Sequence, residues 1–186
     1  MSAMPWPDHL LTLEEWDALP EYESHHVELV EGILLVAPKP APKHQVAMAN
    51  LRSSLKEQLP AEVVAVLDVD VLIDAGPPLT VRAPDVVVVS AERYWQHPKR
   101  FLPEDLRLAV EIVSPGTRRT DRMFKPMEYA KVGIPHYWLV ELDEPITLTA
   151  FDLVGGQYKE VARGTAKIEV PSPFPVEVDL TTLINP

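Results

Sequence analysis

The chain has 186 residues, of which 46 % are hydrophobic and 24 % are charged, and its formal net charge is −11. These proportions are typical of a folded globular domain and exclude a disordered tail, and the length suits one domain, which we expect to span residues 1–186. Because the chain has no cysteine, a disulfide framework and thiolate-bound metal centres are excluded. It has no apolar run near the ~20 residues that cross a bilayer and no basic leader, so we expect a cytoplasmic location.

The first part of the chain predicts a short helix, a hairpin and a longer helix. Thr12 and Glu15 have the spacing of a capping box, which starts a helix. Apolar runs on both sides of Glu31-Gly32 predict a β-hairpin that turns at the glycine. After a proline-rich connector, apolar residues at helical spacing predict an amphipathic helix over residues 44–59.

The rest of the chain is mainly strand, with one further helix over residues 120–131. The predicted strands lie at residues 63–73, 86–89, 108–113 and 137–140, followed by a hairpin around Gly155-Gly156 and a proline-rich tail. Helices and strands mix without regular β–α–β alternation. We therefore expect an α+β (mixed α/β) fold, with a central mixed β-sheet flanked by helices and with extra hairpins.

Two carboxylates occupy positions where a buried strand should not have a charge. Asp85 opens the strand at residues 86–89, and Glu111 lies inside the apolar run LAVEIV. A buried carboxylate is costly unless it is paired, hydrogen-bonded or bound to a metal, and two of them on adjacent strands can hold one Mg²⁺. The alternative is that Asp85 caps a turn after Pro84 and that Glu111 lies on a solvated face of the sheet.

A basic segment follows the second carboxylate. Residues 117–131 contain five basic and two acidic side chains, and Asp121, Lys125 and Tyr129 recur every four residues, so they share one helix face. A lysine near paired carboxylates can neutralise the charge that develops on a phosphate, although a solvated helix with an Asp–Lys pair is the commoner result of such spacing. Pro126 disfavours helical geometry in the residue before it, so the helix either starts near Pro126 or kinks there.

The order of these segments is similar to that of the Uma-two family of restriction-endonuclease-like proteins, members of the PD-(D/E)XK nuclease superfamily. The similarity runs from about residue 12 to about residue 183 and rests on HHVELVEGILL, His44, APDVVVV, LAVEIVSPGTRRTD with Lys125 and Tyr129, and GIPHYWLVE. The resemblance implies a restriction-endonuclease-like core of αβββαβ type and a Mg²⁺-dependent phosphodiesterase site at which Mn²⁺ can substitute. It also implies a homodimer whose substrate is nucleic acid, DNA rather than RNA.

The resemblance also assigns roles to individual residues. Asp85 of the Pro84-Asp85 pair and Glu111 match the two metal-binding acids, and Glu28 matches an upstream acid that completes or orients the metal shell. Lys125 matches the lysine of a D-x-x-x-K element. We therefore expect Asp85, Glu111 and Lys125 to be catalytic, with Asp85, Glu111 and Glu28 as metal ligands.

One position departs from the superfamily pattern. Where that pattern has a lysine two residues after the acid, the chain has Val113, so Lys125 would have to supply the amine from the next helix. The side chains expected to contact nucleic acid are those of His44, Arg118, Arg119 and Arg122. For His44, which follows the proline connector at a helix start, capping or packing is the commoner role.

The acidic balance is uneven along the chain. Residues 1–37 have net charge −8 and residues 132–186 have −5, which leaves residues 38–131 at +2. General attraction to a polyanion is therefore weak, and binding of nucleic acid would require the metal and a local basic surface.

Two other hypotheses remain open at this point. Val113 in place of a lysine and the acidic total favour a catalytically silent module that keeps the nuclease scaffold and binds nucleic acid or protein. The other is a structural protein in which Asp85 and Glu111 pair with Arg118 or Arg119.

Overall fold

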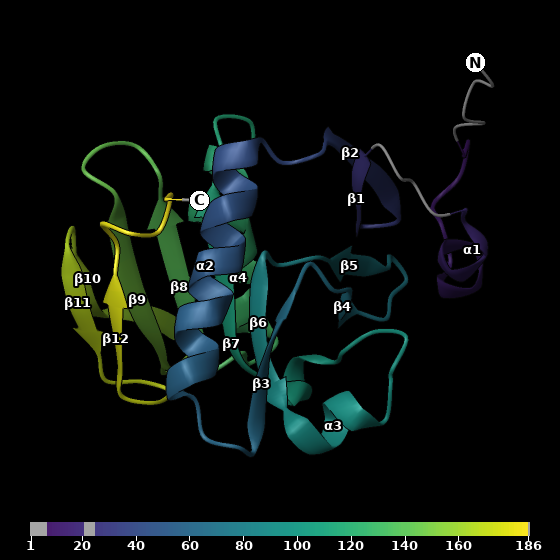
Figure 1. Cartoon of the computed structure of the whole chain (residues 1–186). Helices are drawn as coiled ribbons and strands as arrows, with labels where there is room; N and C mark the ends of the chain where they lie inside the picture. The colour runs from purple at the N-terminus through teal and green to yellow at the C-terminus, as the bar shows by residue number, and fades with distance from the viewer. Residues whose placement is uncertain (1–6, 21–24, 186) are drawn as a thin grey trace.

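The computed structural model describes residues 7–20 and 25–185, and within these ranges the strands form three sheets (Figure 1). The strands are β1 (His25–Val30), β2 (Ile33–Pro38), β3 (Val63–Leu67), β4 (Val71–Asp74), β5 (Thr80–Arg82), β6 (Val86–Ser90), β7 (Leu106–Val113), β8 (His136–Glu141), β9 (Thr147–Val154), β10 (Gln157–Gly164), β11 (Lys167–Val170) and β12 (Val176–Asp179). A six-stranded sheet has the order β10-β9-β8-β7-β6-β3, a four-stranded sheet has the order β2-β1-β5-β4, and β11 pairs with β12.

Helix α2 is long, and the other helices that connect and cover these sheets are short. The α-helices are α1 (Leu13–Ala18), α2 (Pro42–Gln58), α3 (Ala91–Trp95) and α4 (Lys125–Lys131). A 3-10 turn at Pro103–Asp105 leads into β7, and a π-helical turn at Thr120–Phe124 leads into α4. None of the helices in the described ranges is both long enough and apolar enough to cross a membrane.

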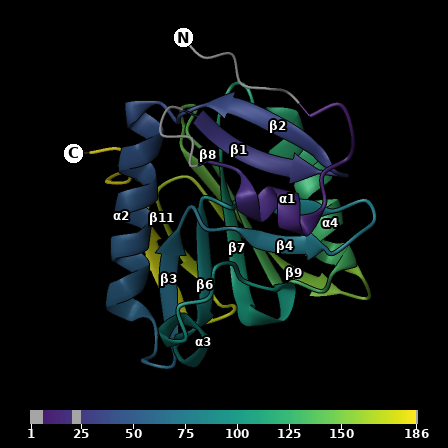
Figure 2. The same ribbon diagram turned by 90° about the vertical axis from the view of Figure 1, so that its right-hand side faces the viewer.

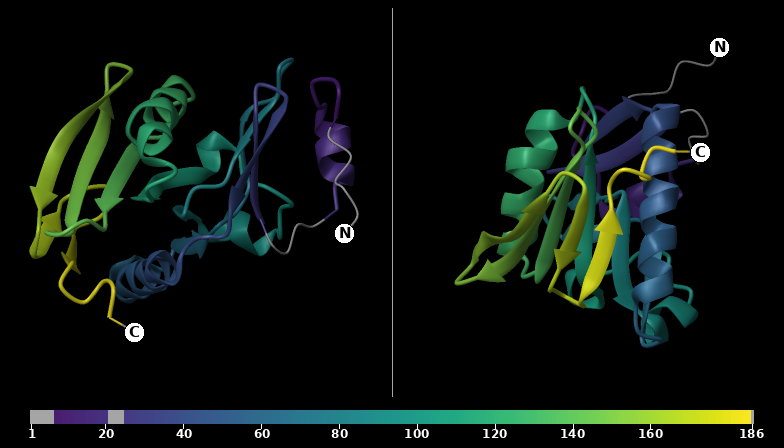
Figure 3. Two further views of the ribbon diagram at one scale, coloured as in Figure 1. Left: turned by 90° about the horizontal axis from the view of Figure 1, so that it is seen from above. Right: turned by 60° about the vertical axis from the view of Figure 1, so that its left-hand side comes forward.

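The six-stranded sheet is mixed, because β7 and β8 run parallel whereas the other neighbours are antiparallel. Helix α2 lies against one face of this sheet and α4 against the other (Figure 3). Along β7, Val110 and Ile112 belong to the core beneath α2, whereas Ala109 and Val113 belong to the core beneath α4. Because side chains alternate along a strand, Glu111 projects from the α4 face. The expected α+β architecture is confirmed.

The four-stranded sheet stands beside the six-stranded one, and α1 lies over β1 and β4 (Figure 2). The predicted capping box is present, since the Thr12 hydroxyl accepts a hydrogen bond from the Glu15 N–H and the Glu15 carboxylate accepts one from the Thr12 N–H. The predicted hairpin is also present. It turns through Glu31 and Gly32, which have φ values of 49° and 79°.

The single strand predicted over residues 63–73 is wrong, because the chain breaks there into β3 and β4 in different sheets. Asp68 follows β3 with φ 47°, a left-handed conformation that aspartate tolerates better than most residues do. Its N–H donates to the carbonyl oxygen of Asp85 at 3.2 Å, which fixes the break next to the start of β6. One apolar run thus supplies an edge strand to each of two sheets.

The predicted proline-rich tail is in fact structured. β11 and β12 form an antiparallel pair, and their buried residues join the core beneath α2. The alternation of apolar and charged residues in KIEV and VEVD is the pattern of a half-buried strand, which the proline content of the segment obscured. Two further elements, the three-residue strand β5 and the short helix α3, were not predicted.

The hairpin turn yields a test of the packing at its tip. At Gly32 a Cβ atom would lie 2.7 Å from the Leu10 Cβ, whereas at Gly155, in the other hairpin turn, it would have nothing within 4 Å. Both glycines have positive φ, which costs an L-residue ~1–2 kcal/mol. We expect Gly32→Ala to lower the free energy of unfolding by more than Gly155→Ala, because only Gly32 adds a steric clash. Urea unfolding of both variants measures this, and equal losses would contradict the packing of Leu10 on the turn.

Candidate active site

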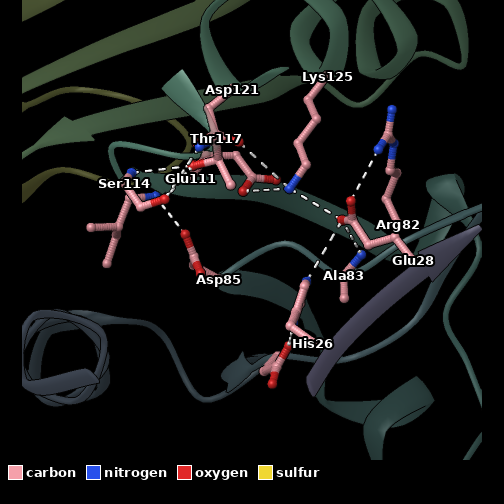
Figure 4. Close-up of polar contacts among 12 residues, drawn as sticks. His26, Glu28, Arg82, Ala83, Asp85, Glu111, Ser114, Thr117, Asp121 and Lys125 are labelled. Carbon is pink, nitrogen blue, oxygen red and sulfur yellow. Dashed lines mark hydrogen bonds and ion pairs between the residues drawn. The ribbon is translucent and has the colours of Figure 1, made fainter. Parts of the chain in front are cut away.

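Four elements bring charged side chains to one place between the two large sheets (Figure 4). Glu28 comes from β1, Asp85 directly precedes β6, Glu111 lies in β7, and Lys125 is the first residue of α4. Glu28, Glu111 and Lys125 are only 4 %, 2 % and 4 % exposed. Glu111 is therefore not on a solvated face, and the alternative that placed it there is wrong.

The Lys125 amine is the common contact of the buried carboxylates. Its Nζ lies 2.8 Å from Glu111 Oε2, 3.2 Å from Glu28 Oε1 and 3.7 Å from Asp121 Oδ1. Burial by itself would lower the pKa of the Lys125 amine, but the surrounding carboxylates, Glu111 foremost, raise it well above its ordinary value. The group is thus an ammonium ion at neutral pH and is not a proton acceptor.

The local helix geometry explains how Lys125 reaches this position. The π-helical turn ends at Phe124 and α4 begins at Lys125, so the helix starts next to Pro126 as one of the two predicted alternatives required. Proline is well suited to the first turn of a helix, where its missing N–H would have no helical partner. The predicted shared face is present but buried rather than solvated, since Asp121, Lys125 and Tyr129 all point into the protein.

Glu111 accepts two hydrogen bonds from that same face. Its Oε2 accepts from Lys125 at 2.8 Å, and its Oε1 accepts from the Tyr129 hydroxyl at 2.7 Å. Burial raises the pKa of Glu111 well above its ordinary value, Lys125 opposes this increase, and the neighbouring carboxylates add to it. Burial and the neighbouring acids therefore both disfavour the ionised form of Glu111, and Lys125 favours it.

Asp85 reaches the site from the adjacent strand. Its Oδ2 accepts a hydrogen bond from the Ile112 N–H at 2.6 Å, so the side chain spans to β7 rather than capping a turn after Pro84. His44 of α2 lies on the other side, with Nε2 2.7 Å from the Ile112 carbonyl oxygen and 3.4 Å from Asp85 Oδ2. His44 is 6 % exposed, which agrees with a packing role more than with direct contact to a phosphate in solution.

Sequence reasoning missed one residue of this cluster, Arg82 of β5. It is 2 % exposed and bonds to Glu28 Oε2 through Nη1 at 3.0 Å. Its Nε and Nη2 each donate to the Glu128 carboxylate at 2.7 Å. The signal in the sequence was an arginine between apolar residues in TVRAPD, the same kind of signal that identified Glu111.

The arginines expected to contact nucleic acid lie outside the buried cluster. Arg118 pairs with Asp143 at 2.6 Å, Arg122 pairs with Glu141, and Arg119 lies over the Phe124 ring at 5.3 Å. The structural hypothesis in which Asp85 and Glu111 pair with Arg118 or Arg119 is therefore wrong about the partners. The partner of Glu111 is Lys125, and the partners of Asp85 are the Ile112 N–H and His44.

The oxygen donors at the site suit a hard divalent cation. In the described ranges, no three His, Asp or Glu side chains are arranged so that they could hold a metal ion by themselves. Mg²⁺ is nevertheless commonly bound by one or two carboxylates and several waters, and Asp85 and Glu111 are the carboxylates that the neighbouring strands β6 and β7 bring to this place. Asp121 Oδ1 is buried and accepts no hydrogen bond from the described residues, although it lies 3.7 Å from the Lys125 ammonium.

Comparison with known proteins agrees with this architecture. The structure is similar to the crystal structure of a "putative nuclease belonging to DUF820" from Anabaena variabilis, with a TM-score of 0.74, over 94 % of this chain and 97 % of that one. The two chains are 22 % identical, so this similarity shows a shared fold. The model of the Uma2 family, described as "Putative restriction endonuclease", matches residues 13–183. The chain belongs to the Uma2 family. No curated protein is significantly similar in sequence.

Asp121 provides a pH test of the buried cluster. Burial raises its pKa to about 6, so the folded chain binds this proton more tightly than the unfolded chain does, and stability falls as the pH rises from about 4 to about 6. We expect Asp121→Asn to be more stable than the parent by ~1–3 kcal/mol at pH 8 and equally stable near pH 4. Thermal unfolding across this pH range measures the difference.

Asp143→Asn is the matched control for that experiment, because Asp143 is 76 % exposed in its side chain. We expect its stability at pH 8 to differ little from that of the parent, because an exposed ion pair contributes little. An Asp121→Asn protein that is less stable than the parent at pH 8 would show that Asp121 contributes more by pairing with Lys125 than it loses by burial.

Proposed function

We propose that the protein is a divalent-metal-dependent endonuclease that hydrolyses phosphodiester bonds of nucleic acid. Asp85 and Glu111 would hold Mg²⁺, or Mn²⁺ in its place, and Lys125 would act on the phosphate. The observation that carries the proposal is the position of the Lys125 ammonium, buried 2.8 Å from Glu111 although Val113 occupies the usual lysine position. The description of the family as restriction endonucleases favours DNA over RNA.

The chemistry of each residue follows from its surroundings. A bound divalent cation lowers the pKa of its water and withdraws charge from a phosphoryl oxygen. Lys125 remains charged at neutral pH, so its role is to stabilise the negative charge that develops on the phosphate, not to take a proton. Tyr129 and Lys125 orient the Glu111 carboxylate by hydrogen bonds to its two oxygens.

A cavity beside the cluster supports access for a nucleic-acid strand. Its volume is about 790 Å³, and it lies between α1, β1 and the first half of α2. His26 and Ala83 line it, and both contact Glu28, which connects the cavity to the buried cluster. Lys39 and Lys99 also line it, and a hydrogen bond to Asp68 raises the pKa of His26 to about 10. Asp17, Asp68 and Asp70 line the same cavity, and Lys99 and His26 pair with two of them, so the cavity has mixed charge and Lys39 is its most available cation.

A silent nuclease-fold module is the second candidate function. The observation that favours it is the saturation of the Lys125 ammonium by carboxylates of the protein itself. In such a protein the buried cluster would stabilise the fold, and the exposed arginines or the cavity would bind nucleic acid or protein without cleavage. The expected homodimer and the cytoplasmic location remain predictions for either function.

Cleavage assays separate the two functions. We expect the parent to cleave duplex DNA, single-stranded DNA or RNA in the presence of Mg²⁺ or Mn²⁺, with DNA preferred. Lys125→Met should lose about two to three orders of magnitude in rate, because the charge on the transition state loses its buried partner. Lys131→Met is the matched control, since Lys131 lies on the same helix but is 78 % exposed in its side chain. Equal effects of the two substitutions would contradict the catalytic role of Lys125.

Metal binding is tested separately by calorimetric titration with Mn²⁺. The parent should bind, and Asp85→Asn and Glu111→Gln should each weaken binding by about tenfold or more because each removes an anionic oxygen ligand. Asp143→Asn should bind as the parent does. Binding without cleavage on any substrate would favour the silent module, whereas the absence of binding in the parent would remove the basis for a metal-dependent mechanism.

A further inference from the structure

Arg82 occupies an unusual place between the two sheets and α4. Its guanidinium is buried and donates hydrogen bonds to two carboxylates. Figure 4 shows the one with Glu28. Through Nη1 it binds Glu28 on β1, and through Nε and Nη2 it binds Glu128 on α4 in a two-pronged contact. Two parallel hydrogen bonds fix the orientation of the Glu128 carboxylate relative to the guanidinium as well as the distance between them. A lysine ammonium at this position could not fix the orientation.

Both carboxylates that Arg82 binds are also connected to Lys125. The second oxygen of Glu28 contacts the Lys125 ammonium at 3.2 Å. Glu128 lies three residues after Lys125 on the same helix, so its contact with Arg82 orients the backbone that carries Lys125. Arg82 is therefore connected to Lys125 in two ways. Through Glu28 it is connected to the Lys125 ammonium, and through Glu128 it is connected to the helix that carries Lys125.

We propose that Arg82 is a positioning residue for Lys125, acting through Glu28 and Glu128, and that Glu28 serves this bridge and is not a ligand of the metal. The inference deepens, and rests on, the proposed phosphodiesterase function. In the following, the Arg82 bridge means Arg82 together with Glu28 and Glu128.

The hydrogen-bonding capacity of Glu28 supports its place in the bridge. A carboxylate offers two lone pairs on each oxygen. Glu28 Oε1 already accepts from the Ala83 N–H at 3.0 Å and contacts Lys125, while Oε2 accepts from Arg82. Within the described ranges Glu111 accepts one hydrogen bond on each oxygen, so it has two contacts where Glu28 has three and keeps more capacity for a cation.

The charges of the cluster leave room for a cation. Arg82 and Lys125 carry two positive charges, whereas Glu28, Glu128, Asp85 and Glu111 supply four carboxylates. A divalent cation at Asp85 and Glu111 would neutralise this surplus. Burial tends to raise the pKa of Glu28, yet Lys125, His26 and Arg82 lower it well below its ordinary value, so this carboxylate stays ionised as the bridge requires.

The first readout is the accessibility of Lys125, which does not depend on cleavage. Limited acylation with acetic anhydride, followed by mass spectrometry, compares the labelling of Lys125 with that of the exposed Lys131 in the same molecule. We expect Lys125 to be protected in the parent and to be labelled several times faster in Arg82→Lys and Glu128→Gln, with Lys131 unchanged. Glu128→Gln guards against a folding defect, because Glu128 is 27 % exposed and its replacement is less disruptive than that of Arg82.

The second readout separates positioning from metal binding. Arg82→Lys, Glu128→Gln and Glu28→Gln should lower kcat about ten- to hundredfold, as loss of supporting residues commonly does, and leave KM and the Mn²⁺ affinity unchanged. Asp85→Asn should instead lose Mn²⁺ affinity. Arg93→Lys is the matched control, because Arg93 also forms an ion pair, with Asp105 at 3.2 Å, but does not contact the buried cluster. This substitution should change none of these quantities.

Two results would overturn the inference. The first is that Lys125 is labelled no faster in Arg82→Lys and Glu128→Gln than in the control Arg93→Lys, which would mean that the bridge does not position it. The other is loss of Mn²⁺ affinity in Glu28→Gln as large as in Asp85→Asn, which would make Glu28 a metal ligand. If the parent neither cleaves nor binds Mn²⁺, the proposed function fails, and the labelling of Lys125 still decides whether the Arg82 bridge positions it.

Discussion

The buried ammonium of Lys125 is the interaction on which the site depends. Removing an unpaired charge from water costs several kcal/mol, so a lysine that is 4 % exposed must be surrounded by anions with good geometry. Glu111 supplies one from the six-stranded sheet and Glu28 supplies another from the four-stranded sheet. The need to compensate a single cation thus holds three parts of the fold together, and it concentrates at one point the acids that a divalent metal would also require.

Much of this arrangement could be predicted from local signals. The capping box at Thr12, the hairpin at Gly32 and the valine-rich strands follow from spacing alone, because hydrophobic periodicity reflects burial directly. Asp85 and Glu111 were recognisable because a charge inside an apolar run is too costly to occur without a partner. The role of Lys125 was suggested by the family resemblance, and the structure places its amine against Glu111.

The parts that were not predicted depend on contacts between residues far apart in the sequence. The break at Asp68 divides an apolar run between two sheets, and nothing in the periodicity of that run indicates which sheet each half joins. The alternation in residues 167–179 was present but was outweighed by nearby prolines. Arg82 lies 46 residues from Glu128 and 54 from Glu28, so no spacing rule connects them. Tertiary charge compensation of this kind becomes visible only when the elements are placed in space.

Because the lysine is Lys125 on α4 and not a residue at position 113, the contact between acid and lysine is maintained in a different way. On one strand, an acid and a lysine two residues apart are held near each other by the covalent chain, whatever the rest of the molecule does. Here Glu111 and Lys125 meet only when α4 docks on the sheet. Seven residues are too few for a helix to persist alone in water, and undocking would separate Glu111 from both of its hydrogen-bond donors. Helix formation, helix docking and the pairing of Lys125 with Glu111 are therefore a single cooperative event, and local opening of α4 breaks this ion pair and uncovers the apolar core beneath the helix at the same time.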